Sequence, residues 1–299
     1  MPMLALLTFT FAALLAGLIV GALLNRTGFD RRVDAEVAEL FAEIETMPTY
    51  YSERELEGLP PPVQRFFRRN LQDGAPHPSC LRTRDAGRVR QRPGQPWTEY
   101  AGEHYAVASA PAMLWFARLR PLPLVWVDAR NLYLRGRGHT LTKLLSSLSS
   151  VDLRDDATRG ALLLDYVAEL ALMPGALLPA DDRGWEPVDE QAARFSVRDG
   201  ELRVAGVFHF DELGNIVRFE TEDRPYQADP APASARWVVR YAEHRSFGEC
   251  QLPTKIDTQW QLDEQTFHYV ERTIEALEHD IPRRFAADEA RARNDAANA

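Results

Sequence analysis

Six successive runs of alternating apolar and polar residues occupy the last third of the chain and constrain its fold more than any other feature. The runs cover residues 193–197, 202–210, 217–221, 237–241, 256–262 and 267–273. Side chains of a β-strand point to opposite faces in turn, so the alternation predicts six strands connected as an antiparallel meander with one covered face. Between the first two runs, Asp199-Gly200 is a dipeptide typical of a type I′ hairpin turn.

Further strands are predicted upstream of this meander. Their apolar or alternating runs cover residues 81–91, 97–108, 113–119, 125–128 and 132–135. The first two are separated by a Pro-Gly turn and read as another hairpin. Together the runs predict a domain of about ten or eleven strands over residues 76–281.

One long helix is predicted between the two sets of strands, from Ala157 to Met173. Large side chains recur along it at a spacing of three to four residues, and Pro174 with Gly175 ends it. The face consists of Leu162, Tyr166, Glu169, Leu170 and Met173. The predicted fold class is therefore α+β, with this helix packed on an antiparallel sheet.

The N-terminal segment is apolar and carries no charge from Met3 to Leu24. At about 1.5 Å of rise per residue, such a helix crosses a hydrocarbon core of about 30 Å, so residues 1–28 predict a single-pass membrane anchor. A cleaved signal peptide is the alternative, because Val20-Gly21-Ala22 resembles a cleavage site. The run is longer than a usual signal-peptide core, and no Lys or Arg precedes it, which favours the anchor.

The side of the membrane on which the large domain lies stays open. Arg26, Arg31 and Arg32 follow the apolar run, and the positive-inside rule places such residues in the cytoplasm. The fold to which the chain is compared below is usually met outside the cytoplasm. These two indications disagree.

Two juxtamembrane helices are predicted over residues 29–75, and a flexible tail over residues 282–299. The first helix has an apolar stripe, which consists of Val33, Val37, Leu40, Phe41 and Ile44. Leu59-Pro60-Pro61-Pro62 precedes the second helix, which proline can begin but not continue. The tail is rich in Ala, Arg, Asp and Asn.

The composition excludes several classes of function. A formal net charge of -9 argues against nucleic acid or an anionic membrane surface as a partner. The only cysteines, Cys80 and Cys250, have no metal-ligand spacing; two buried thiols, or one disulfide in an exported domain, are both compatible with them. Gly136-Arg137-Gly138 lacks the third glycine of a nucleotide loop, and no catalytic motif is present, so we expect no cofactor, no metal and no catalytic residue.

A ligand site is predicted where large amphipathic rings and a carboxylate meet the central helix. The candidate residues are Trp115, Tyr133, Tyr166, Glu169, Trp185, Arg224, Trp237 and Tyr241. The alternative for each aromatic ring is ordinary packing in the core of the sheet. Glu169 can hold the head group of a ligand, or it can form a buried structural pair with Arg224 or an indole. Asp165 lies one helical turn before Glu169, so either one of the two has a raised pKa or one points to solvent, and we expect the second.

The order of these segments resembles a family of uncharacterised bacterial proteins, the DUF6544/DUF6920 type, over about residues 55–275. The residues that carry the resemblance are 59–68 (LPPPVQRFFR), 133–138 (YLRGRG), 166–185, Phe210-Asp211, Gly214, Arg224, Trp237, Tyr241 and Trp260. In place of an expected Arg-Tyr pair, this chain has Asp165-Tyr166. The resemblance implies a curved half-barrel with the helix on its concave face, as in bacterial lipoprotein carriers, and implies no activity.

These observations together favour a membrane-tethered, non-catalytic protein that binds a hydrophobic or amphiphilic ligand such as a lipid. Residues 3–24 would attach it to the membrane. Two alternatives stay open: a structural or interaction module of a cell-envelope complex, and a hydrolase or transferase that uses a cavity carboxylate.

Overall fold

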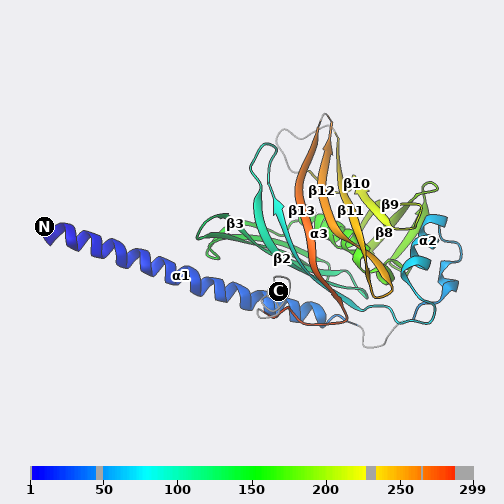
Figure 1. Ribbon diagram of the computed structural model, residues 1–299, viewed down its shortest axis with the longest axis horizontal. Coiled ribbons are helices and arrows are strands. Elements are labelled where there is room, and N and C mark those ends of the chain that lie inside the picture. Colours follow the sequence, from blue (N-terminus) through cyan, green and yellow to red (C-terminus); the bar gives the residue numbers. More distant parts are fainter. Residues whose placement is uncertain (1, 45–49, 227–233, 264, 287–299) are drawn as a thin grey trace, which may run out of the picture.

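One antiparallel sheet of thirteen strands forms the body of the protein within the part of the chain that the structure describes (Figure 1). The computed structural model describes residues 2–44, 50–226, 234–263 and 265–286. The strands are β1 (Cys80–Val89), β2 (Thr98–Val107), β3 (Ala112–Leu122), β4 (Val125–Leu134), β5 (Arg137–Leu144), β6 (Leu148–Leu153), β7 (Arg183–Pro187), β8 (Ala192–Asp199), β9 (Leu202–Phe210), β10 (Ile216–Thr221), β11 (Ala235–Phe247), β12 (Cys250–Leu262) and β13 (Thr266–His279).

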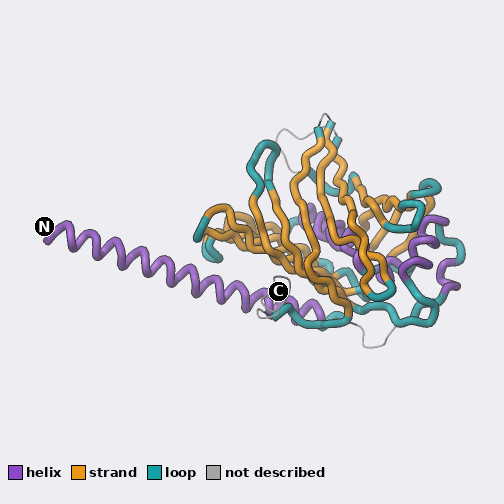
Figure 2. The backbone as a smooth tube through the Cα atoms, viewed as in Figure 1, coloured by secondary structure: helices purple, strands orange, loops and turns teal. Residues whose placement is uncertain are grey.

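The sheet consists of two meanders, the first of strands β1–β6 and the second of strands β7–β13, which are joined where β1 pairs with β13. Its spatial order is β6-β5-β4-β3-β2-β1-β13-β12-β11-β10-β9-β8-β7, so β1 pairs with β13 and every other strand lies beside its neighbour in sequence. The sheet is curved and stays open, with β6 and β7 at its two edges (Figure 2). An α+β fold with an open antiparallel sheet, as predicted, is confirmed.

Six helical segments accompany the sheet in the described residues. They are α1 (Pro2–Phe41), η1 (Glu53–Leu56), α2 (Pro61–Asn70), α3 (Asp156–Glu169), η2 (Leu170–Leu172) and η3 (Pro174–Leu177). The predicted central helix corresponds to α3 and η2, and the predicted short helix after the prolines corresponds to α2.

The position of α3 follows from the topology. It connects β6 to β7, which lie at opposite edges of the sheet, so the chain must cross the sheet between them. The helix lies within the curve of the sheet (Figure 2). Asp155 caps it, because its side chain accepts a hydrogen bond from the backbone N–H of Thr158 at 2.7 Å.

The concave face of the sheet packs against α3, α2 and the two short helices that follow α3. Leu163 and Tyr166 of α3 and Phe66 of α2 are fully or almost fully buried in this core, together with Phe195 and Phe208 of the sheet. Burying apolar surface at about 25 cal/mol per Å² is the main term that holds these helices in the concavity.

The opposite face of the sheet packs against the second half of α1. Val33, Val37 and Leu40 are buried there against Tyr105 of β2 and Leu114 of β3. Side chains alternate along β2, so Tyr105 faces α1 while Ala106 faces the concave core. One strand thus serves two separate cores.

The structure differs from the predicted strands in the first meander. β4 is continuous where two short strands were predicted, and β5 and β6 were not predicted; in the second meander, β7 was not predicted. β6 lies at an edge and exposes Leu148 and most of its other side chains, so its sequence shows no alternation. An exposed edge strand needs no apolar face, which explains the missing signal.

The predicted hairpin turn is displaced by one residue. Asp199 pairs with Leu202, so the two central residues are Gly200 and Glu201. Of these only Gly200 has a positive φ, 61°. A positive φ at the first position alone is the requirement of a type II′ turn, which corrects the predicted type I′.

The segment predicted as an N-terminal anchor and the first of the two helices predicted after it are parts of one helix, α1, whose first half projects away from the body (Figure 1). Within the described residues, no helix combines the length and the apolar character that are needed to span a bilayer. Of the tail predicted over 282–299, residues 287–299 lie outside the described residues, while Phe285 packs in the core beneath α1.

Candidate functional site

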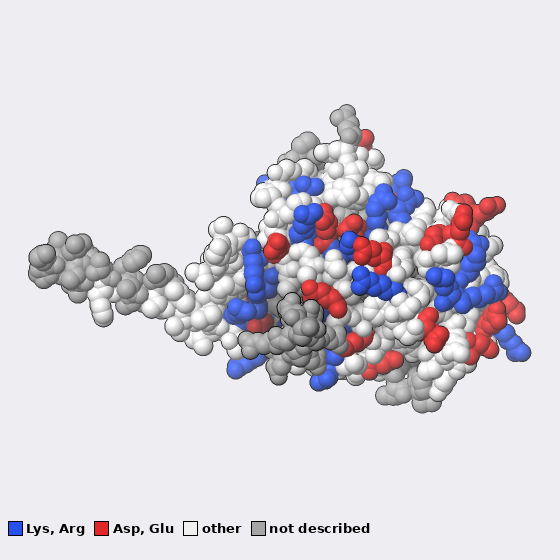
Figure 3. Space-filling view, viewed as in Figure 1, with Lys and Arg blue, Asp and Glu red and all other residues white. Residues whose placement is uncertain are grey.

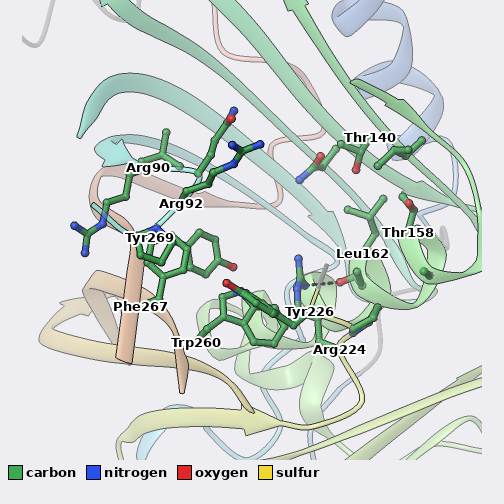
Figure 4. Close-up of a pocket in the computed structure, with 18 residues that line it drawn as sticks. Arg90, Arg92, Thr140, Thr158, Leu162, Arg224, Tyr226, Trp260, Phe267 and Tyr269 are labelled. Atoms are coloured by element: carbon green, nitrogen blue, oxygen red, sulfur yellow. Dashed lines mark hydrogen bonds between the residues drawn. The ribbon is translucent and has the colours of Figure 1, made fainter. Parts of the chain in front are cut away.

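Two adjoining cavities open on the concave side of the sheet. The outer cavity has a volume of about 910 Å³ and lies between the β1–β2 loop, the start of α3 and the ends of β12 and β13. Its aromatic wall consists of Tyr226, Trp260, Phe267 and Tyr269, and Figure 4 shows this wall opposite Leu162 of α3. The cavity thus has one aromatic and one aliphatic side.

The inner cavity has a volume of about 240 Å³ and shares Val89, Asn131, Arg224 and Tyr269 with the outer one. These shared residues place the two cavities next to each other. The other residues that line the inner cavity are Tyr100, His104, Met113, Trp115, Asp165, Ala168, Glu169, Trp237, Val239, Ile256, Thr258, Val270 and Arg272. Charged side chains therefore make up a larger share of the lining in the inner cavity than in the outer one.

A cluster of buried polar side chains lies at the inner cavity. Arg272 of β13 donates from Nη1 to Oε1 of Glu169 on α3, and from Nη2 to the hydroxyl of Thr83 at 3.0 Å. Its Nε lies 3.5 Å from Oδ2 of Asp85, and Nδ1 of His104 lies 3.2 Å from Oε2 of Glu169. One guanidinium thus neutralises two buried carboxylates from different elements.

Several atoms of this cluster have no hydrogen-bond partner in the described structure. They include Nε2 of His104, Nε of Arg272 and both carboxylate oxygens of Asp85. Buried polar groups are nearly always hydrogen-bonded, so these atoms are exceptions within the core. Nε of Arg272 and Oδ2 of Asp85 face each other as an ion pair, and other atoms of His104 and Arg272 line the inner cavity.

Burial and the ion pair change the pKa values of the cluster in different directions. Burial raises the pKa of Asp85 to about 6, although Arg272 opposes this shift. Burial lowers the pKa of His104 to about 4 and outweighs the opposite effect of Glu169. Burial also acts to raise the pKa of Glu169, but Arg272 and His104 together hold that pKa below its ordinary value. At neutral pH, His104 is therefore neutral and Glu169 is ionised.

A second ion pair closes the inner cavity on the side of α3. Nη1 of Arg224 lies 2.6 Å from Oδ1 of Asp165 and also donates to the carbonyl oxygen of Ala161 at 2.7 Å. Its guanidinium lies 4.4 Å from the ring centroid of Trp237. Asp165 was expected in solvent; instead it is paired, and burial raises its pKa in spite of Arg224. Each carboxylate of α3 thus has its own arginine.

The structure brings four of the eight predicted site residues together. Trp115, Glu169, Arg224 and Trp237 line the inner cavity. The indole of Trp237 donates to the hydroxyl of Tyr269 at 2.7 Å. Glu169 was expected to pair with Arg224 or an indole if it were structural, but its arginine is Arg272.

The other four predicted residues line neither cavity and make structural hydrogen bonds. Tyr133 donates to Oδ2 of Asp199 at 2.7 Å. Tyr166 donates to the carbonyl oxygen of Val107, Trp185 to that of Leu177 and Tyr241 to that of Ala168, at 2.8–3.0 Å. These contacts connect distant elements and use the polar atom of each ring.

Sequence reasoning missed His104, Asp85 and Arg272. In β13, Val270 pairs with Thr258 and His268 pairs with Gln259, so Tyr269 is an extra residue, a β-bulge. The bulge shifts the alternation by one and turns Arg272 inward. Asp85 could have been found, because it alternates with Leu81 on the inward face of β1.

The described residues contain no group of three or more His, Cys, Asp or Glu side chains that could hold a metal ion. Cys80 and Cys250 are both free thiols. Burial raises the pKa of Cys80 to about 11, so this thiol is protonated at neutral pH. The thiol of Cys250 donates to the carbonyl oxygen of Asn70 at 3.1 Å.

Comparisons with known proteins give a family and two distant structures. No curated protein matches the chain. A domain assigned to outer membrane lipoprotein sorting, from Vibrio parahaemolyticus, aligns with 8% identity and a TM-score of 0.36, over 72% of this chain and 91% of that one. A LolA superfamily protein from Nitrosomonas europaea aligns with 10% identity and a TM-score of 0.37, over 76% of this chain and 94% of that one. Residues 49–272 match the model of a family of unknown function, and the chain therefore belongs to the DUF6544 family.

Proposed function

We propose that this protein binds a hydrophobic or amphiphilic small molecule, such as a lipid, in the outer and inner cavities, without covalent chemistry. The observation that carries the proposal is a cavity of about 910 Å³ that has an aromatic wall and is also lined by Arg90 and Arg92, and that adjoins a smaller cavity lined by buried charged side chains. Ligand pockets are commonly about 300–1,000 Å³, mostly apolar, with a few polar groups that fix orientation. A purely structural module has no need for such a space.

The two cavities support one orientation of the ligand. Hydrocarbon would lie against Trp260, Phe267 and Leu162 in the outer cavity, where burial is worth about 25 cal/mol per Å². A polar head group would reach the inner cavity, whose lining includes the charged side chains of Glu169, Arg224 and Arg272. Hydrogen bonds to charged groups are stronger than neutral ones, so such contacts would fix the orientation of the head group.

Binding can be tested with the full-length protein and a fluorescent fatty acid, cis-parinaric acid. Ala157 lines the outer cavity on the first turn of α3, and an indole at this position would fill part of the space. We expect saturable binding by the wild type, a loss of at least about tenfold in affinity, or about 1.4 kcal/mol, for Ala157→Trp, and no change for Ala157→Ser. Saturable binding that Ala157→Trp leaves unchanged would place the site elsewhere.

We further propose that α1 tethers the protein to a membrane. The support comes from the sequence: residues 3–24 are apolar and uncharged. The full-length protein should then remain in the membrane pellet after alkaline carbonate washing. A mature chain that begins near Leu23 would indicate a cleaved signal peptide instead.

A second candidate function is acid–base catalysis, as in a hydrolase. It is favoured by one observation, the 3.2 Å approach of His104 to Glu169 with Nε2 of His104 at the inner cavity. Hydrolysis of fluorogenic esters that is lost in His104→Ala, with parinaric acid binding retained, would support it. Absence of turnover in the wild type would leave the binding function.

A further inference from the structure

Two hairpin turns of the sheet lie against α1 where its projecting half leaves the body. The amide of Asn25 donates to the hydroxyl of Ser147, in the β5–β6 turn, at 2.9 Å. The guanidinium of Arg26 lies 5.6 Å from the ring centroid of Trp126, which follows the β3–β4 turn. A groove of about 950 Å³ separates residues 19–26 of α1 from the β3–β4 turn. Both turns therefore lie at the same level along the helix.

The tips of these hairpins expose leucines. Leu124 is 94% exposed, Leu122 64% and Leu148 68%. Leu124 also has a φ of 65°, a conformation that non-glycine residues rarely adopt, at the point where the chain reverses. Ile19 and Leu23 of α1 are also exposed and line the same groove as Leu122 and Leu124, so these apolar side chains form one group. Contiguous exposed apolar groups of this kind indicate an interaction surface.

Within the described residues, the groove beside these leucines is lined by Arg26, Arg118 and Arg120 and by no Asp or Glu, although the whole chain is acidic. Arg118 is paired with Asp30 and Asp128, so Arg26 and Arg120 carry the positive charge of this groove. Figure 3 shows blue side chains where the helix joins the body and none on its described projecting part. Arg and Trp beside an apolar segment are typical of the interface between a bilayer and water. Basic residues at this level attract anionic lipids.

We propose that Leu122, Leu124 and Leu148, together with Ile19 and Leu23 of α1, form a membrane-docking face that enters the interfacial layer of a bilayer containing anionic lipid. The inference rests on the proposed tether, because α1 would bring this face to the bilayer. The occupant is a lipid surface rather than a protein, because the face continues into the uncharged stretch of α1.

The mouth of the outer cavity lies at the same end of the strands as the docking face. In an antiparallel sheet, the β1–β2, β3–β4 and β5–β6 connections all lie at one end of the strands, and the β12–β13 connection pairs with that end. Residues 90–93 of the β1–β2 connection line the outer cavity. The mouth of the cavity thus belongs to the end of the sheet that carries the docking face, where an amphiphile could pass between bilayer and protein.

The test uses the full-length protein reconstituted in vesicles of phosphatidylcholine with a minority of phosphatidylglycerol. An environment-sensitive NBD fluorophore is attached at Leu124→Cys and, as a matched control, at Leu213→Cys, which is 65% exposed in the β9–β10 turn at the opposite end of the strands. Labelling of the unsubstituted chain gives the background from Cys80 and Cys250. We expect a blue-shifted emission and quenching by nitroxide-labelled lipid at position 124, and neither at position 213.

The outcomes separate docking from tethering. Emission at position 124 that equals emission at position 213, in protein that floats with the vesicles, would overturn the docking face and retain the tether. Protein that does not float with the vesicles would overturn both. Leu122→Asp with Leu124→Asp should abolish vesicle quenching at a third label, Leu148→Cys, while flotation persists; unchanged quenching there would also contradict the proposal.

Discussion

Glu169 of α3 and Arg272 of β13 form a buried ion pair that fixes the crossing helix to the centre of the sheet. The two residues are 103 positions apart in sequence. The same guanidinium lies near Asp85 of β1, the strand that pairs with β13 to join the two meanders. The polar cluster therefore connects the helix with both halves of the fold and also borders the inner cavity.

Removing the charge of Glu169 should destabilise the protein. Glu169→Gln leaves Arg272 buried with less compensation, and breaking such a pair from one side costs about 3–5 kcal/mol. The free energy of unfolding in urea measures this loss. The control is Glu271→Gln, because Glu271 pairs with Arg88 at the surface, where a salt bridge contributes about 0–1 kcal/mol.

The double variant distinguishes a structural pair from a ligand site. The double variant Glu169→Gln with Arg272→Met should lose less stability than the sum of the losses in the two single variants. The reason is that each single variant leaves one charged partner of the pair uncompensated, whereas the double variant removes both charges. If Glu169→Gln instead leaves stability nearly unchanged but strongly alters parinaric acid affinity, Glu169 acts on the ligand and the structural interpretation is wrong.

Relative to the wild type, stability should change with pH in opposite directions in the variants His104→Gln and Asp85→Asn. The pKa of His104 is lowered on folding to about 4, so its contribution is present above pH 6.5 and is lost as the pH falls toward 4. The pKa of Asp85 is raised on folding to about 6, so its contribution is present below pH 3.8 and is lost as the pH rises through 6. Between about pH 6 and pH 4 the two effects oppose each other.

Urea denaturation at several pH values tests these signs. Relative to the wild type, His104→Gln should gain stability as the pH falls from about 6.5 to 4, by up to about 1.4 kcal/mol per pH unit. Asp85→Asn should lose stability relative to the wild type as the pH falls from about 6 to 4. Parallel curves for both variants and the wild type would mean that neither group titrates as its burial requires.

The β8–β9 hairpin depends on the backbone conformation of one glycine. Gly200 has a φ of 61°, and no atom lies within 4 Å of the place that a Cβ would occupy, so a substitution there meets strain but no collision. Gly200→Val should cost more than about 1 kcal/mol of unfolding free energy, and Gly200→Asn less, because Asn tolerates this region. Gly184 in β7 has equal space and no positive φ, so Gly184→Val should be close to neutral. Equal losses at both positions would contradict this account.

The sequence predicted β8–β13 and α3 because each buries one face and therefore shows a regular period. It did not predict β6, since a strand with most side chains in solvent has no apolar period. It also misplaced Asp165, because pairing with Arg224, 59 positions away, is a tertiary contact that no local pattern carries. Arg272 was missed because of the β-bulge at Tyr269. A single extra residue in a strand reverses which of the following side chains face inward, and the sequence pattern does not show the bulge.

The most direct test of the central claim is the content of the cavity in full-length protein purified in mild detergent. Organic extraction followed by mass spectrometry should recover about one amphiphile per chain from the wild type and clearly less from Ala157→Trp at equal stability, because the added indole occupies part of the same cavity. Wild-type protein that yields no stoichiometric amphiphile and also fails to bind parinaric acid would contradict the claim that this fold is built to hold a ligand.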